Sequence, residues 1–419
     1  MKTKFDQDTA EFIEKHPTCF HVIAGQKEML EEAGFCRLLE TEDWELQAGG
    51  KYFVLRNDSA IIAFQIPKGE WKGYSITASH CDSPCLKIKE NPEMKDKKYT
   101  RLNVEAYGGA ILSTWFDKPL SVAGRLSVNE GGKLKNLLVD MEEDLLVIPN
   151  LAIHMNRQVN DGYKYNVQKD LLPLYGKADA EDFMARIAAK AGVEREQILS
   201  SDLFVYNRQP FSFWGGEFMS GPRIDDCMCA YASVRGFLAA EPEAKTAVHV
   251  VYDNEEVGSS TKQGAASTFL KDVLTRISQF LHEGNNTYTK DIASSFMLSA
   301  DNAHGIHPNY PEKCDPVNQP VLGGGVVLKF SANQKYTTDG YTAAQVKLLA
   351  EQAGVAIQVF TNRSDVPGGS TLGNISGNQV PVPTADIGVA QLAMHSSWET
   401  CGCGDAQQLM ELTKQLFSL

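Results

Sequence analysis

The sequence contains no apolar run of membrane-spanning length, and its N-terminal segment lacks the apolar core of a signal peptide. Its nine cysteines include no CxxC pair, which excludes a zinc knuckle built from paired thiolates. Cys227 and Cys229, like Cys401 and Cys403, are too close in sequence to pair easily. We therefore expect reduced, mostly structural thiols in a cytoplasmic protein.

Positive charge is also scarce. Lysine and arginine number 40 against 53 aspartate and glutamate residues, and the net charge of −13 argues against nucleic acid or membrane as a partner. Internal repeats and low-complexity tracts are absent, and the composition is that of an ordinary soluble globular protein. At 419 residues, the chain is expected to form two or three domains.

The residue pattern changes twice along the chain. Residues 1–89 carry two helical patterns and three short strand patterns, residues 90–216 alternate as in a β-rich module, and strands and helices alternate from residue 217 onward. We expect residues 1–89 and 217–419 to form one split α/β domain of layered α/β/α type, with residues 90–216 inserted as a β-rich domain. In the third part, strands are predicted at 246–252, 294–300, 321–330, 356–361 and 384–389, and helices at 226–239, 264–282, 341–353 and 405–418.

An acidic stretch follows the first of these strands. Asp253, Glu255 and Glu256 place three carboxylates within four residues at the end of a short, apolar, β-branched run. Such a cluster is costly unless a cation or a substrate compensates its charge. Glu255 and Glu256 point in different directions, so that one can bind metal while the other handles protons. On this motif alone, a solvated acidic turn is the simpler interpretation.

Further polar residues occupy equivalent places. His80 follows the predicted strand 74–78, Asp225 opens the predicted helix 226–239, Asp301 follows the strand 294–300, and His395 follows the strand 384–389. Taken singly, a structural histidine or a helix N-cap explains each residue as well. Together they fall at strand or loop ends of one α/β unit, where ligands of open α/β sheets gather.

The residue types in this set indicate a metal site. Histidines and carboxylates without thiolate suit zinc, manganese or cobalt. Five protein ligands exceed those of one tetrahedral zinc with an open position, and they suit two metals that share a bridging carboxylate. A remaining carboxylate can take the proton of an activated water and deliver it to a leaving amine. The pattern therefore favours metal-assisted amide hydrolysis.

Several segments resemble the metalloaminopeptidase family that contains aspartyl aminopeptidase and vacuolar aminopeptidase I. The resemblance spans nearly the whole chain in order, including a segment within the expected insertion. The matching segments are residues 79–84, 148–154, 222–226, 253–259, 299–310 and 392–396.

This resemblance implies a role for each residue of the predicted site. Two divalent metal ions per chain are implied, zinc in the first place with cobalt or manganese as alternatives. Asp225 would bridge the two ions, and its choice over Asp226 rests on the resemblance. The remaining ligands would be His80 and Asp301 on one ion and Glu256 and His395 on the other.

The resemblance also implies the residues of catalysis and assembly. Glu255 would be the general base and Asp82 would support it. His154 would reach the site of a neighbouring subunit and stabilise the tetrahedral intermediate. Family members form large homo-oligomers, typically tetrahedral dodecamers, through the inserted domain, and peptides are their substrates.

The substrate preference stays open at this point. From their spacing, metal binding and substrate binding are equally open to His304 and His307, and the resemblance implies that they lie near the substrate. Gly369 and Ser370 in a glycine-rich loop would line the pocket, unless that loop is an ordinary flexible one. Aspartyl aminopeptidases of animals read an acidic side chain with a lysine close to a Gln-Arg-Tyr segment. The matching segment here has Asn333 just ahead of Gln334, and Lys335 in place of the arginine. Lys335 would either serve an acidic substrate or simply be solvated, which is the commoner fate of a lysine. Asn333 can hydrogen-bond an acidic group without neutralising it, so acidic and neutral or apolar N-terminal residues both remain candidates.

Two rival functions remain. A di-metal deacylase or other amidohydrolase on the same fold would not require a free α-amine. A non-catalytic assembly protein would retain the site as a relic, against which the complete set of metal and base residues argues.

Overall fold

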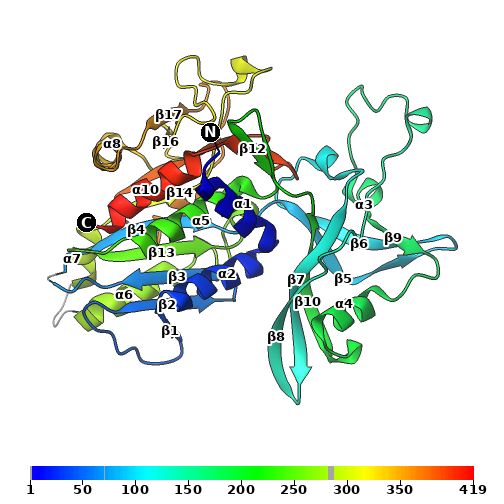
Figure 1. Ribbon diagram of the computed structural model, residues 1–419, viewed down its shortest axis with the longest axis horizontal. Coiled ribbons are helices and arrows are strands. Elements are labelled where there is room, and N and C mark those ends of the chain that lie inside the picture. The colour runs from blue at the N-terminus through cyan, green and yellow to red at the C-terminus, as the bar shows by residue number, and fades with distance from the viewer. Residues whose placement is uncertain (1, 70, 282–286) are drawn as a thin grey trace. The chain divides into compact units, whose positions relative to one another are not determined.

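The computed structural model describes residues 2–69, 71–281 and 287–419 (Figure 1). The chain forms two compact units. The first comprises Met1–Asp82, Ser212–Met394 and Glu399–Leu419, and the second comprises Ser83–Phe211 and His395–Trp398. Within the described residues, every helix is too short or too polar to cross a membrane.

The first unit is built on a mixed sheet to which thirteen of the described strands belong. Its centre has the order β13-β4-β14-β18, and these four strands are parallel. Buried strands of a parallel sheet are mostly apolar on both faces, as Ala247, Val248, Val250 and Val251 of one such strand illustrate. The strands are β1 Cys36–Leu38, β2 Lys51–Arg56, β3 Ala60–Gln65, β4 Tyr74–His80, β11 Ser212–Trp214, β12 Phe218–Gly221, β13 Thr246–Tyr252, β14 Phe296–Ala300, β15 Ala303–His304, β16 Val326–Phe330, β17 Ile357–Thr361, β18 Thr384–Leu392 and β19 Glu399–Gly402.

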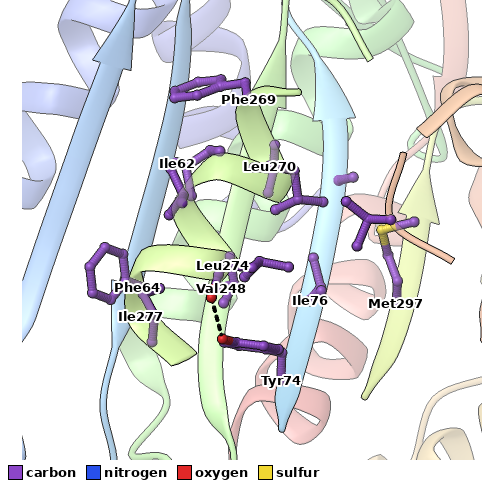
Figure 2. Packing of buried hydrophobic residues seen from close by; sticks show 14 of the residues in the cluster. Ile62, Phe64, Tyr74, Ile76, Val248, Phe269, Leu270, Leu274, Ile277 and Met297 are labelled. Carbon is purple, nitrogen blue, oxygen red and sulfur yellow. Dashed lines mark hydrogen bonds between the residues drawn. The ribbon is translucent and has the colours of Figure 1, made fainter. Parts of the chain in front are cut away.

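Helices cover both faces of this sheet. Helices α2, α5 and α10 pack on one face, where Phe237 of α5 lies against Phe417 of α10 with ring centroids 5.2 Å apart. On the other face, Figure 2 shows Leu270 and Leu274 of α6 directed toward Ile76 of β4 and its neighbours. The helices of this unit are α1 Lys4–Lys15, α2 Cys19–Glu32, α5 Ile224–Ala239, α6 Phe269–Leu281, α7 Thr287–Ala293, α8 Gly340–Ala353, α9 Leu372–Ser376 and α10 Asp405–Phe417.

The second unit contains a separate antiparallel sheet of six strands in the order β8-β7-β10-β5-β6-β9. The amphipathic helix α4 contributes Phe183 and Ile187 to its hydrophobic core. The elements are β5 Cys85–Lys95, β6 Tyr99–Tyr107, β7 Leu120–Glu130, β8 Lys133–Asp140, α3 Val167–Asp170, β9 Leu174–Lys177, α4 Phe183–Ala191 and β10 Ile198–Asn207. The predicted fold class, a layered α/β sheet accompanied by a β-rich part, is confirmed.

Two predicted elements begin five residues later than expected. The strand predicted from residue 321 starts at Val326, because Gly323 and Gly325 adopt φ values of +80° and +95° and turn the chain before it extends. The helix predicted at 264–282 starts at Phe269, after a series of turns, and its predicted last residue lies outside the described residues.

Candidate metal centre

Three of the parallel strands deliver polar side chains to one edge of the first unit's sheet. His80 is the last residue of β4 and pairs in register with Tyr252, the last residue of β13. Glu255 and Glu256 lie in the short 3-10 helix η4 (Glu255–Val257) just beyond β13. Asp301 directly follows β14. Since these strands run parallel, their carboxyl ends meet at the same edge.

The side chains at this edge form a tight cluster. Potential ligand atoms of His80, Asp225 and Glu256 all lie within 4.8 Å of one another, and so do those of Asp225, Asp226 and Asp301. His80 Nε2 is 3.6 Å from Asp225 Oδ1 and 4.0 Å from Asp301 Oδ1. Four of the five residues predicted as metal ligands are thus brought together, and Asp226 joins them.

The imidazole of His80 is held in one orientation. Its Nδ1 lies 3.1 Å from the main-chain oxygen of Asp82 and 3.4 Å from Asp82 Oδ1. This contact leaves Nε2 directed toward the carboxylates of Asp225 and Asp301. An oriented, buried imidazole of this kind is the usual arrangement of a histidine metal ligand.

Asp82 also fixes the turn that carries the two glutamates. Its Oδ1 accepts a hydrogen bond of 3.0 Å from the Glu255 main-chain N–H, and its Oδ2 accepts one of 3.1 Å from that of Glu256. Asn254, immediately before them, adopts φ +63° and reverses the chain. The buried carboxylate of Asp82 therefore positions both the predicted general base, Glu255, and the predicted metal ligand, Glu256.

Asp225 and Asp226 lie at the start of α5 but do not share its helical conformation, and the peptide bond between them is cis. The Asp225 N–H donates to Glu399 Oε2 at 3.1 Å. Asp226 Oδ2 accepts from the His80 N–H at 3.2 Å. Arg223 precedes α5 as a whole, and the regular helical conformation begins only after Asp226.

The electrostatics of the cluster call for a bound cation. Burial, reinforced by neighbouring carboxylates, raises the pKa of Glu255 to about 7 and that of Glu256 to about 11. Burial also raises the pKa of Asp301 and of Asp226. For His80, burial lowers the pKa, but hydrogen bonds to Asp225 and Asp82 outweigh it and the pKa is raised well above the ordinary value. Carboxylates this crowded ionise together only where positive charge compensates them.

Two residues of the predicted site belong to the second unit. His395 adopts φ +68° and places Nδ1 3.1 Å from the carbonyl oxygen of Gly109. His154 is exposed in the 3-10 turn η2 (Ile153–Met155). The roles of His395 as a ligand and of His154 in a neighbouring subunit's site stay predictions.

A pocket of about 310 Å³ in the first unit contains part of the predicted substrate residues. His304, His307 and Gly369 line it, whereas Asn333, Lys335 and Ser370 are exposed residues outside its lining. The hydroxyl of Ser370 donates to Asn374 Oδ1 at 2.8 Å. The complete lining is His304, Gly305, His307, Lys313, Cys314, Phe360, Thr361, Asn362, Arg363, Val366, Pro367, Gly368, Gly369, Gln391, Leu392 and Ala393.

Sequence reasoning assigned no role to two residues that the structure places beside the cluster. Glu399 accepts the N–H of Asp225 and lies in a segment whose pattern gives it no special signal. Lys329 is only 1% exposed, and its Nζ donates to the main-chain oxygen of Asp301 at 2.8 Å. A lysine within the apolar strand Val326–Phe330 was the available signal, because lysine is almost never fully buried unless paired.

Known proteins share both the sequence and the fold. The family model described as "Aminopeptidase I zinc metalloprotease (M18)" matches residues 12–417. The chain is 42% identical over 430 residues to "Probable M18 family aminopeptidase 2" of Clostridium novyi (strain NT), covering 100% of this chain and 99% of that protein. The chain belongs to the M18 family.

Solved structures agree with this assignment. The M18 chain superimposes with a TM-score of 0.95 and 33% identity on a chain from the cryo-EM structure of the Ape4 and Nbr1 complex, covering 98% of this chain and 85% of that one. It matches a chain of the S. cerevisiae mApe1 dodecamer with a TM-score of 0.87 and 28% identity, covering 99% and 96%.

Membership makes the protein an M18 metalloaminopeptidase, a hydrolase of a zinc metalloprotease family. The donor set fits zinc, since it combines an oriented imidazole with several carboxylates and its clustered ligand atoms include no thiolate. The predicted family and enzyme class are confirmed.

Proposed function

We propose that this M18 aminopeptidase removes the N-terminal amino acid from peptides at a two-zinc site, with Glu255 as the general base. The observation that carries this proposal is the crowding of His80, Asp225, Glu256 and Asp301 within one buried cluster. Glu255 stands next to Glu256 on a turn fixed by Asp82, so that ligand and base are held by the same carboxylate.

The proposed ligands divide between two ions. Asp225 would bridge them, His80 and Asp301 would complete the first, and Glu256 and His395 would complete the second. When bound, zinc polarises the scissile carbonyl and lowers the pKa of a coordinated water. Cobalt or manganese would suit the same N/O donors.

Glu255 would carry the proton. In the buried cluster its pKa is raised to about 7, and a neighbouring cation lowers it, so the carboxylate would be ionised and ready to accept a proton at neutral pH. After taking the proton of the attacking water, the carboxyl group of Glu255 would return it to the leaving amine. Asp82 would keep the Glu255 main chain fixed during both transfers.

The pocket favours acidic and neutral side chains over basic ones. His304, His307, Lys313 and Arg363 are among its lining residues, and none of the lining residues carries a carboxylate. Arg363 and Lys313 are the two full positive charges of the lining, and Arg363 is paired with Asp365 at 2.7 Å. A positive wall attracts an acidic side chain and repels a basic one. Phe360, beside these groups, offers contact to an apolar side chain.

Assembly completes the proposal. The related mApe1 of S. cerevisiae forms a dodecamer, and a dodecamer joined through the inserted residues 90–216 is proposed here. His154, exposed on η2, would then reach the site of a neighbouring subunit and hydrogen-bond the developing oxyanion.

Replacing Glu255 tests the proposed chemistry. Because Gln cannot accept the proton, we expect Glu255→Gln to lower kcat by a factor of about 10² to 10⁴ while zinc content and assembly size match the wild type. Aminoacyl p-nitroanilides and their N-acetylated forms would be assayed side by side, and only the free amines should be cleaved. Glu351→Gln, an exposed change on α8, is the matched control and should retain full activity.

The results that would contradict the proposal are distinct. Undiminished turnover in Glu255→Gln would remove Glu255 as the base. Cleavage of the N-acetylated substrates would favour a deacylase on the same fold. A single zinc ion per chain in fully active enzyme, measured by elemental analysis, would exclude the two-metal site.

A further inference from the structure

Lys329 is a buried cation beside the proposed metal ligand Asp301. Its Nζ donates to the main-chain oxygens of Asp301 and Asn302 at 2.8 and 3.3 Å, and it lies 3.9 Å from Asp301 Oδ2. The ammonium also lies over the ring of Tyr336, 5.2 Å from its centroid. Lys329 therefore holds both the backbone and the carboxylate of the segment that follows β14.

A buried aspartate stands opposite Lys329 on the neighbouring strand. Asp386 of β18 pairs in register with Lys329 of β16, so both side chains point to the same face of the sheet. Asp386 is fully buried, and its two carboxylate oxygens face two different loops. Oδ1 accepts the hydroxyl of Thr371 at 2.6 Å, and Oδ2 accepts the hydroxyl of Thr337 at 2.6 Å together with the Thr337 N–H.

These two loops carry residues of the predicted substrate site. Thr371 directly follows Gly369 and Ser370, and Thr337 follows Lys335 by two residues. A third contact comes from α9, where a Cβ added to Gly373 would meet Asp386 Oδ1 at 2.9 Å and Ser299 Oγ at 2.8 Å. Glycine thus allows this segment to approach the carboxylate closely.

We infer that Lys329 and Asp386 are positioning residues with separate tasks: Lys329 sets Asp301 for metal binding, and Asp386 fixes the two loops that carry predicted substrate residues. The inference rests on the proposed function, because it takes Asp301 as a ligand and the loops as substrate contacts. Each residue acts through others, and neither needs to touch the substrate. Asp301 is the main electrostatic partner of the buried Lys329 ammonium and Asp386 adds to it, so this cation is not buried without compensation.

The loop half of the inference is tested with Asp386→Asn and Thr371→Val, two changes that preserve side-chain size. We expect each variant to raise KM about tenfold with kcat and zinc affinity near the wild type, because a lost buried hydrogen bond of this kind is worth about a factor of ten. Hydrogen exchange of the intact zinc enzyme should be faster in residues 331–338 and 366–371. Thr371→Ser retains the hydroxyl and should restore wild-type KM and exchange.

The metal half is tested with Lys329→Met, which keeps the length and removes the charge. We expect zinc affinity, measured by competition with a graded chelator, to fall 10- to 100-fold, as is typical for groups that orient a metal ligand. Exchange of residues 366–371 should change less than in Asp386→Asn. Lys329→Gln, which keeps one donor group, should lie between Lys329→Met and the wild type.

The outcomes separate this inference from the proposed function. A wild-type protein that fails to bind zinc or to cleave aminoacyl substrates would defeat the proposed function itself. With an active wild type, unchanged KM and loop exchange in both Asp386→Asn and Thr371→Val would overturn the role of Asp386. Unchanged zinc affinity in Lys329→Met would overturn that of Lys329, whatever the change in melting temperature.

Discussion

Burial strongly lowers the pKa of His249. Its ring is fully buried on β13, with Nε2 3.1 Å from Gln26 Oε1 and Nδ1 3.3 Å from Thr77 Oγ1. Burial lowers the pKa of His249 to about 3. The neighbours satisfy both ring nitrogens of a neutral imidazole, and they include no carboxylate that would favour the charged form.

Acidification is expected to destabilise the protein through this residue. The unfolded chain protonates His249 near pH 6.5, whereas the folded chain keeps it neutral down to about pH 3, so stability is lost as the pH falls between these values. Between pH 6.5 and 4.5 the wild type should lose about 2 kcal/mol of unfolding free energy more than His249→Gln. Urea unfolding of both proteins at the two pH values measures the difference, and equal losses would contradict the assignment.

The sequence allowed four metal ligands to be proposed as neighbours, because each follows the end of a predicted strand or loop and ligands of open α/β sheets gather there. These residues are His80, Asp225, Glu256 and Asp301. It did not allow the contacts of Lys329 or Glu399 to be predicted. Lys329 lies about thirty residues beyond Asp301 in the chain, and only the pairing of β16 with β18 places it beside that aspartate. The orientation of the turn that carries the two glutamates could not be predicted either. The contacts of Asp82 with Glu255 and Glu256 depend on the φ of +63° at Asn254.

At the scale of elements, the central strands depend on α6 for one of their covering layers. Leu274 of α6 is fully buried in the cluster shown in Figure 2, and its main-chain oxygen accepts the Tyr74 hydroxyl at 2.8 Å. The same strands, β4 and β13, present His80 and the acidic turn at their ends. Packing of α6 is thereby connected to the geometry of the proposed site.

Shortening the buried side chain of Leu274 is expected to destabilise the protein. Leu274→Ala should lower the free energy of unfolding by about 2–5 kcal/mol, because it removes buried methyl groups and leaves a cavity. Leu348→Ala on α8, whose side chain is 59% exposed, is the matched control and should stay within about 0.5 kcal/mol of the wild type. Thermal or denaturant unfolding distinguishes them, and a cost for Leu274→Ala as small as that of the control would show that α6 is dispensable for the core.

Elements with strong periodicity were the predictable ones. The strands at β3, β4 and β13 and the helix α10 carry clear apolar patterns and appear close to their expected bounds. The short strands β12 and β19 carry too few residues for a pattern, and they exist because they pair with each other through Phe218–Gly221 and Glu399–Gly402. Such pairing joins segments far apart in sequence, which no local signal reports.

At the scale of the whole molecule, the proposed assembly makes one chain complete the site of another. We expect His154→Ala to lower kcat about 10²- to 10³-fold, the usual effect of losing one oxyanion donor, with zinc content unchanged. If His154 acts in a neighbouring subunit, co-assembling His154→Ala with Glu255→Gln should generate sites that contain both native residues. Such mixed oligomers, purified with two different tags, should recover activity that neither variant has alone.

The same mixture tests the arrangement directly. Activity no greater than that of the two separate variants would place His154 and Glu255 in the same chain's site or remove His154 from catalysis. Light scattering of each sample should give a mass about twelve times that of one chain, in keeping with the dodecamer of the related mApe1.

The second unit is formed by two separate segments of the chain. Although most of that unit is one stretch, Ser83–Phe211, it also takes in the four residues His395–Trp398. Gly109 provides the carbonyl that meets His395 Nδ1, the Ile111 N–H donates to the His395 oxygen, and Thr114 bonds to Ser397. A shortened protein that joined Asp82 to Ser212 would keep the proposed ligand but lose every one of these contacts. The inserted residues therefore cannot simply be deleted. In evolution or in engineering, they could be exchanged only together with a new means of orienting His395.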